Sequence, residues 1–316
     1  MSFKINYAVL PQAIPVTQSL LYTCFLRPIL TSRFLLFCAA SLGSSTAKKI
    51  QSVLKGFALK YAQTSTPKAI SLIYGGDTLQ KFESLLETAS KVITATKQTQ
   101  VEFNAKLSLD IAIEEKQSNK GKEVAILNCA NRSNVGGIWT YFHGGSQEEA
   151  LFRNSDLDWY LNSEKNPDLK DQIKNSLDAT LGQHHIPYYG ITFSKNVEIL
   201  QPKAFLNVLS AAVIDLRFWS TEKQHFDNCT NRSELIKLVT MAKIDSIFAA
   251  ALIEKQDILV LSAIGCGAFK NDHGMIAECF NEICNKYNGK FEKFLFSLPD
   301  ENIRKVFSEK ISLNSL

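Results

Sequence analysis

The sequence predicts an α/β fold layered around a mostly parallel β-sheet. Short apolar runs typical of buried strands, at residues 124–127 and 258–262, alternate with longer amphipathic segments typical of helices. A glycine-containing loop follows each of these two runs. Alternating strands and helices favour a parallel sheet, and such sheets bind ligands at the carboxyl ends of their strands. We therefore expect a ligand site near the two glycine loops.

The first 65 residues do not show this alternation. Residues 20–38 are apolar, but Arg27, Pro28 and Arg33 interrupt them, so they lack the uncharged run of ~18 residues that a membrane span needs. Residues 1–19 also lack the ordered basic and apolar blocks of a signal peptide. We interpret residues 1–65 as a helical extension that packs on the main domain or on a partner. Residues 41–49 are its joint, and residues 66–316 form the main domain.

The elements before the central strand are predicted as follows. Residues 79–93 predict a helix with Asp77 or Thr78 as its N-cap. Its apolar face comprises Leu79, Phe82, Leu85, Leu86, Ala89, Val92 and Ile93. Residues 101–103 predict a short strand, and residues 118–121 predict a turn. The apolar positions between residues 107 and 113 fit a strand or a helix equally well.

The second half of the chain continues the alternation. Residues 158–181 are polar with helical stretches, and residues 186–193 and 205–216 predict strands. Ser233 is the expected N-cap of a helix. The apolar face of that helix comprises Leu235, Ile236, Leu238, Val239 and Ala242. After the strand at 258–262 we expect a helix at 275–287, a strand at 291–298 and a closing helix at 302–310.

Composition excludes some classes of function. The chain has 316 residues, 45% of them hydrophobic, which is enough for the core of one large domain or two. A formal net charge of +4 is too small to indicate nucleic-acid binding. The seven scattered cysteines predict a reduced compartment rather than a disulfide framework, with most of the thiols buried as small apolar groups.

The segment from 124 to 157 carries the predicted chemistry. Its strand leads into Gly136-Gly137 and Gly144-Gly145, and Ser146 then precedes Gln147-Glu148-Glu149 at a helix start. Glycine loops and helix N-termini suit phosphates. Two carboxylates beside such a loop would not bind the phosphate, so they suggest chemistry on a group attached to it. Alternatively, Ser146 and Glu149 form a capping box that only satisfies helix-end donors.

Other candidates also have structural alternatives. Asn131 could simply hold a turn, and Gly265 and Gly267 could form an ordinary strand-to-helix turn. His184-His185 has no Cys or carboxylate at ligand spacing, so we predict no metal site there. His143, beside the glycines, is a candidate substrate contact.

Two motifs in this order resemble those of macrodomain-type poly(ADP-ribose) glycohydrolases of the bacterial type. The first runs from Asn128-Cys129-Ala130-Asn131 through Gly136-Gly137 to Gln147-Glu148-Glu149, with Arg153 and Ser155 beyond. The family has a third glycine where this chain has Ile138, followed by a six- to eight-residue spacer that is eight residues long here. The second is Gly265-Cys266-Gly267-Ala268-Phe269, followed by Asp272. The resemblance covers about residues 66 to 310.

This resemblance implies a macrodomain-like three-layer α/β/α sandwich with a mixed, mostly parallel sheet. It implies hydrolysis of an O-glycosidic bond of ADP-ribose, with Glu149 as general acid and base and with Glu148 and Asn131 on ribose hydroxyls. The diphosphate would be held by backbone N–H groups of Val135, Gly136, Gly137 and Ile138, and of Gly265, Cys266, Gly267, Ala268 and Phe269. Phe269 would press on the distal ribose, and Phe296 would stack on adenine. Gln147 belongs to the same substrate-binding set, and no cofactor or metal is implied.

The departures from the family pattern leave alternatives open. Ile138 adds a side chain where the diphosphate would pass, and Val135 and Trp139 alter the same wall. The chain could instead be a non-catalytic reader of ADP-ribose, a hydrolase of mono-ADP-ribosylated proteins, or a relative that has lost its ligand. As partners we expect ADP-ribose or an ADP-ribosylated protein, without nucleic acid or membrane. We expect a monomer in the cytoplasm, of its own cell or of a cell that receives it by export.

Overall fold

The computed structural model describes residues 69–93, 97–132, 134–139, 145–177 and 185–316. These residues form a seven-stranded sheet in the order β1-β4-β5-β3-β6-β7-β2. The strands are β1 (Ile70–Gly76), β2 (Gln100–Asn104), β3 (Val124–Cys129), β4 (Tyr189–Leu200), β5 (Lys203–Ala211), β6 (Ile258–Ser262) and β7 (Lys293–Ser297). β4 pairs antiparallel with β1 and β5, and all other pairs are parallel. The predicted mixed, mostly parallel sheet is therefore confirmed.

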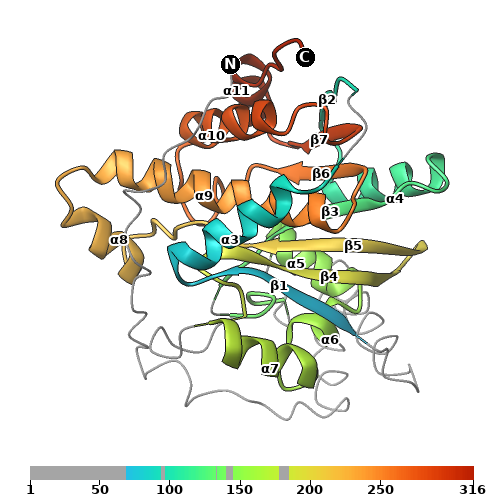
Figure 1. Cartoon of the computed structure of the whole chain (residues 1–316), viewed down its shortest axis with the longest axis horizontal. Coiled ribbons are helices and arrows are strands. Elements are labelled where there is room, and N and C mark those ends of the chain that lie inside the picture. The colour runs from blue at the N-terminus through green and yellow to red at the C-terminus, as the bar shows by residue number, and fades with distance from the viewer. Residues whose placement is uncertain (1–68, 94–96, 133, 140–144, 178–184) are drawn as a thin grey trace, which may run out of the picture.

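Helices cover both faces of this sheet (Figure 1). The helices are α3 (Leu79–Ser90), α4 (Ser108–Ser118), α5 (Gln147–Asn154), α6 (Leu157–Leu161), α7 (Pro167–Ser176), α8 (Thr221–Asp227), α9 (Arg232–Ile253), α10 (His273–Lys286) and α11 (Glu301–Lys310). Side chains of α3, α9, α10 and α11 share one hydrophobic cluster with the sheet, and those of α4, α5 and α6 share another. No helix in the described part of the chain is long and apolar enough to span a bilayer.

The packing of the central strand β3 explains why its sequence is continuously apolar. Ala125 and Leu127 belong to the cluster on the α9 face, whereas Val124 and Ile126 belong to the cluster on the α4 face. Because successive side chains of a strand point to opposite faces, a strand covered on both faces needs apolar residues at every position. Each such buried side chain contributes ~1.5–3 kcal/mol to folding. This packing fixes the strand end from which the first glycine loop leaves.

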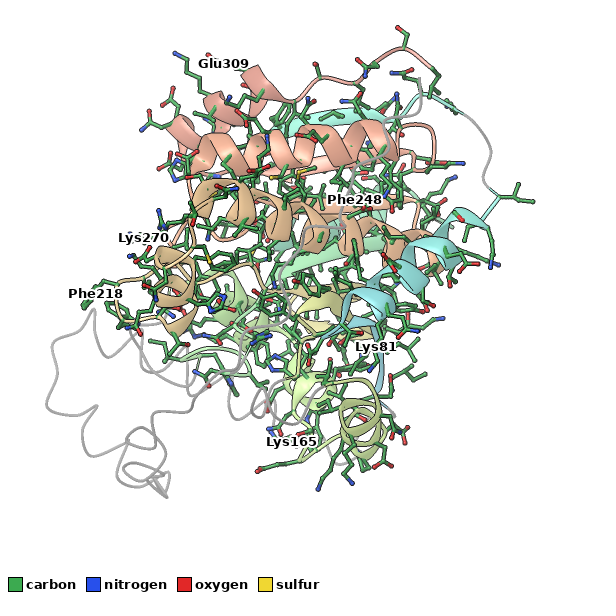
Figure 2. All side chains as sticks on the ribbon, turned by 60° about the vertical axis from the view of Figure 1, so that its left-hand side comes forward. Lys81, Lys165, Phe218, Phe248, Lys270 and Glu309 are labelled. Carbon is green, nitrogen blue, oxygen red and sulfur yellow. The ribbon has the colours of Figure 1, made fainter. Side chains whose placement is uncertain are left out.

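The α9 side of the core is dominated by aromatic residues. Phe248 on α9 is fully buried, and Figure 2 shows it inside the helical layer. Its ring lies 5.1 Å from that of Phe294 on β7 and 5.5 Å from that of Tyr287 at the end of α10. These offset and edge-on contacts join α9, α10 and the sheet into one layer.

The outer edge of β1 is closed by a side chain from α7. The Gln172 side-chain oxygen accepts the Ile73 N–H at 3.0 Å, and its Nε2 donates to the Ser71 carbonyl at 2.7 Å. The side-chain amide thus takes the place of a neighbouring strand.

Several predicted elements are confirmed, and two need correction. Thr78 caps α3, but that helix ends at Ser90 and leaves Ile93 96% exposed. The segment left undecided at 107–113 enters a helix, α4. α9 begins at Arg232 with Asn231 as its N-cap, so the assignment of Ser233 as the cap is wrong.

β1 and α8 were not predicted. The expected helices of residues 1–65 and their joint lie outside the described residues.

Candidate active site

The first glycine loop connects β3 to α5, and α5 begins with a complete capping box. The Ser146 hydroxyl accepts the Glu149 N–H at 3.3 Å, and the Ser146 N–H donates to Glu149 Oε2 at 2.8 Å. The structural role of Glu149 that the sequence suggested is therefore present. The capping bond uses Oε2 of Glu149, and Oε1 accepts a second backbone donor from the loop.

The loop is folded around both carboxylates. Glu148 accepts the Asn131 N–H at 3.0 Å through Oε2 and the Gly136 N–H at 3.2 Å through Oε1. Glu149 accepts the Ile138 N–H at 3.2 Å through Oε1. Only 3% of Glu148 and 6% of Glu149 are exposed. Two adjacent acids of one helix are thus fixed by backbone donors before any ligand binds.

Gly137 lies between the two acids. Its φ of +60° belongs to the left-handed region, and a Cβ built on it would lie 3.2 Å from Glu149 Oε1 and 3.5 Å from Glu148 Oε2. A side chain here would crowd both carboxylates. Ile138, by contrast, is not among the residues with positive φ, so its backbone does not require the family's third glycine. Its side chain is 47% exposed.

Burial raises the pKa of Glu148 to about 8. The N–H groups of Asn131 and Gly136 oppose this shift because they favour the ionised form. A carboxyl with this pKa is mostly protonated at neutral pH, so it has a proton to donate in a hydrogen bond.

The second glycine loop follows β6, and contacts with neighbouring residues fix its conformation. Gly265 has a φ of +77°, and its Cα packs so closely on Val213 that a Cβ would lie 2.2 Å from the valine side chain. The Asn271 side chain donates to the Ile214 carbonyl at 2.8 Å and to the Gly265 carbonyl at 3.3 Å. The loop therefore has one defined shape.

Three successive N–H groups of this loop remain available. Within the described part of the chain, the N–H groups of Gly267, Ala268 and Phe269 donate no hydrogen bond. Gly267 and Ala268 are exposed, and a Cβ on Gly267 would meet nothing within 4 Å. Consecutive exposed N–H groups form an anion-binding concavity.

A cleft of about 1090 Å³ joins the two loops and the carboxylates. Most of the residues predicted from the sequence line it. They are Asn131, Gly137, Ile138, Gln147, Glu148, Glu149, Gly265, Gly267, Ala268 and Phe269. The structure thus brings the two distant motifs together in one site.

Four predicted residues do not line the cleft. Phe296 is fully buried, and its ring stacks on Phe103 at 5.5 Å, so its assignment to adenine stacking is wrong. Val135 packs on the α4-side hydrophobic cluster, and Gly136 is buried behind Glu148. Cys266 is 7% exposed, and burial raises the pKa of its thiol to about 12, which makes it a poor nucleophile.

The predicted diphosphate role of the first loop also needs revision. The Gly136 and Ile138 N–H groups bind the carboxylates, and the Gly137 N–H donates to the Asn134 carbonyl at 3.0 Å. These donors are engaged within the protein. The second loop is therefore the better candidate for the diphosphate.

Gln147 connects the site to its supporting elements. Its side-chain oxygen accepts the Cys129 N–H at 2.8 Å, and its Nε2 donates to the Ser108 hydroxyl at 3.1 Å and to the Leu127 carbonyl. Although Gln147 lines the cleft, these three bonds use its amide to fix the start of α5 against β3 and α4.

The sequence reasoning missed Arg217. Its guanidinium lies 5.1 Å from the ring centre of Phe269 and 5.2 Å from that of Trp219, and it forms an ion pair with Asp215 at 2.5 Å. Arg217 lines the cleft, and the adjacent Phe218 projects at the edge of the molecule (Figure 2). The only feature of the sequence that could have pointed to Arg217 is the Arg-Phe-Trp run after β5.

Of the His184-His185 pair, the structure describes His185. His185 is buried, and its backbone N–H donates to the Arg132 carbonyl at 3.3 Å. His143 and His184 lie outside the described residues. Among the residues that the structure describes, no group of three or more His, Cys, Asp or Glu is placed to hold a metal ion.

Comparisons with known proteins agree with the resemblance seen in the sequence. Residues 57–189 match the model of the family described as microbial-type PARG, catalytic domain. A search of curated proteins gave no match.

Solved structures of bacterial poly(ADP-ribose) glycohydrolases share the fold. That of Thermomonospora curvata bound to the inhibitor ADP-HPD is 21% identical, with a TM-score of 0.57 over 82% of this chain and 88% of that chain. That of Deinococcus radiodurans in complex with ADP-ribose is 20% identical, with a TM-score of 0.58 over 81% of this chain and 96% of that chain. Residues 57–189 therefore resemble the microbial-type PARG catalytic domain, and the chain has the α/β fold of the bacterial poly(ADP-ribose) glycohydrolases.

Proposed function

We propose that this protein hydrolyses an O-glycosidic bond of ADP-ribose, in poly(ADP-ribose) or on an ADP-ribosylated protein, and releases ADP-ribose. The observation that carries the proposal is the pair of adjacent buried acids, Glu148 and Glu149, in one cleft with the open N–H groups of the second loop. The family match and the complexes of similar proteins with ADP-ribose and ADP-HPD support it. We place the protein in the cytoplasm as a monomer.

The diphosphate binds the second loop in this proposal. The N–H groups of Gly267, Ala268 and Phe269 border the same cleft, and charge-assisted bonds from backbone N–H groups to phosphate oxygens are stronger than neutral ones. Phe269 lies against the distal ribose. Arg217, whose side chain lies over the Phe269 ring, holds that ring in place.

The acids act on the proximal ribose. Glu149 donates a proton to the leaving oxygen as the bond to C1″ opens towards an oxocarbenium ion, and then removes a proton from the attacking water. General acid–base catalysis of this kind increases the rate by ~10²- to 10⁴-fold. Glu148, protonated at neutral pH, and Asn131 bind the ribose hydroxyls. These steps require no metal or cofactor.

Release of free ADP-ribose tests the proposal. The protein is incubated separately with automodified poly(ADP-ribose) and with mono-ADP-ribosylated proteins, and free ADP-ribose is quantified by chromatography. A Glu149→Gln protein is the matched control. Release by the parent and not by the variant supports hydrolysis. A parent that binds ADP-ribose but releases none from either substrate would show that the protein is a reader.

A further inference from the structure

The segment between β5 and α8 carries two large aromatic side chains that are open to solvent. Phe218 is 80% exposed and Trp219 is 57% exposed, and Figure 2 shows Phe218 projecting from the edge of the molecule. Their ring centres lie 4.4 Å apart in an edge-to-face arrangement. A single exposed apolar side chain needs no explanation, but exposed rings that pack on each other form the kind of patch that marks a binding surface. We call Phe218 and Trp219 the aromatic pair.

The neighbouring Arg217 holds the aromatic pair in place. Its guanidinium lies 5.2 Å from the centre of the Trp219 ring. The Arg217 Nε donates to Asp215 Oδ1 at 2.8 Å, and the Asp215 N–H donates to the Glu222 carboxylate on α8 at 2.7 Å. Because these bonds fix the guanidinium, the Trp219 ring packs on an ordered partner. Little conformational entropy is then lost when a ligand binds to the ring.

The same guanidinium connects the aromatic pair to the second loop. It lies 5.1 Å from the centre of the Phe269 ring, and the Leu216 N–H donates to the Phe269 carbonyl at 2.9 Å. Arg217 and Phe269 both line the cleft. Since Arg217 contacts Phe269 and Trp219, the aromatic pair borders the cleft on its second-loop side.

This location corresponds to one part of the substrate. In the proposed function, on which this inference rests, C1″ lies at Glu149, the diphosphate lies at the second loop and the distal ribose lies against Phe269. Adenine is bonded directly to that ribose, so the base lies close to Phe269 as well. Phe296, to which the family resemblance assigns adenine, is fully buried and stacks on Phe103. The base therefore needs a different partner in this chain.

An indole beside a guanidinium has the chemistry that recognises a purine. Flat bases stack on aromatic side chains and on the planes of arginine side chains. One indole ring can cover one face of a base, whereas a stable protein partner needs about 1,000 Å² of total buried interface. The small area of the aromatic pair therefore favours a base over a protein as its occupant.

We propose that Trp219, held by Arg217 and Phe218, stacks on the adenine base of ADP-ribose and makes the cleft selective for an adenine nucleotide. This contact lies at the opposite end of the ligand from C1″, so it stabilises the bound substrate and the transition state equally. Trp219→Ala should therefore raise KM and leave kcat within ~2-fold of the parent value.

Two ligands that differ only in the base test the assignment. One is ADP-ribose, and the other is a base-free analogue in which a diphosphate joins two riboses. Calorimetry on Trp219→Ala should show that Kd for ADP-ribose rises at least ~10-fold, while Kd for the base-free analogue changes less than ~2-fold. Trp219→Phe keeps an aromatic face, so its Kd for ADP-ribose should stay within ~3-fold of the parent value.

Phe205→Ala is the matched control. Phe205 is 49% exposed and has Lys203 at 5.9 Å from its ring centre, but it lies at the start of β5, whereas Trp219 follows the end of that strand. This variant should bind both ligands as the parent does. An unchanged Kd for ADP-ribose in Trp219→Ala would overturn the inference. An equal loss of affinity for both ligands would also overturn it, because the substitution would then act on the second loop and not on the base. Both results leave the proposed function standing, whereas a parent protein that does not bind ADP-ribose would refute the proposed function and the inference with it.

Discussion

Glu149 belongs to the capping box of α5 and is the proposed proton donor, and a single substitution separates these two roles. Gln at this position keeps the side-chain shape and is accepted in a capping box. We therefore expect Glu149→Gln to keep the stability of the parent and its affinity for ADP-ribose, while turnover falls at least ~10²-fold because the proton donor is lost. Chemical denaturation, ADP-ribose binding and product release are measured on the same preparation. Full turnover by a correctly folded Glu149→Gln protein would refute the mechanism.

Glu148→Gln is the companion experiment. Since its proposed role is to bind ribose hydroxyls, this variant should lose less rate and more affinity than Glu149→Gln. The reverse pattern would exchange the roles of the two acids.

The raised pKa of Glu148 predicts a specific pH dependence of stability. The pKa is about 8 in the folded protein against an ordinary value of 4.5, so the stabilisation associated with the neutral carboxyl is complete below about pH 4.5 and is lost as the pH rises to about 8. The free energy of unfolding of the parent, minus that of Glu148→Gln, should therefore fall between these values by up to ~1.4 kcal/mol per pH unit. Urea unfolding at pH 5, 6.5 and 8 measures the difference. A constant difference would mean that the carboxyl is ionised throughout this range.

At the scale of elements, the loop between β3 and α5 accommodates Ile138 at the position where the family pattern has a third glycine. Ile138 takes a backbone conformation open to any residue, and its N–H still reaches Glu149. If the exposed side chain obstructs the polymer, Ile138→Gly should increase release from poly(ADP-ribose). The added glycine should also cost about 1 kcal/mol of stability. Turnover and thermal unfolding are measured together, and unchanged or lower turnover would show that Ile138 does not obstruct the polymer.

Most elements are visible in the sequence, and those that were missed have physical reasons. β1 was missed because its segment, ISLIYGG, has no clear alternation, and bonds from Gln172, about a hundred residues later, support it. The end of α9 was not predicted, because all of residues 239–252 are buried and this part of the helix has no exposed polar face.

The site was predictable where its chemistry lies within a short segment. Ser146, Glu148 and Glu149 are adjacent in sequence, and their loop is local. Phe296 was misassigned because an alternating strand pattern does not reveal that both faces of β7 are covered. The place of Arg217 in the cleft depends on how distant elements pack, which spacing alone does not encode.

At the scale of the whole molecule, ligand binding should stabilise the fold. A ligand at a hundredfold excess over its Kd adds about 2.7 kcal/mol to the free energy of unfolding. In the proposed site ADP-ribose reaches from the second loop to the acids, so it should raise the Tm clearly, and AMP at the same concentration should raise it far less. Thermal unfolding with each ligand measures this. Equal shifts would show that the protein does not recognise the second phosphate and the distal ribose.

The contact between the Gln172 side chain of α7 and the outer strand β1 affects how easily the protein can associate with other copies of itself. A bare outer strand is a template on which another chain can add by backbone pairing, the first step towards edge-to-edge aggregates. Here the Ser71 carbonyl and the Ile73 N–H are already bonded to one amide of the same chain. A strand from a second copy would have to displace that amide before it could pair, so this margin of the sheet is protected against self-association in crowded solution.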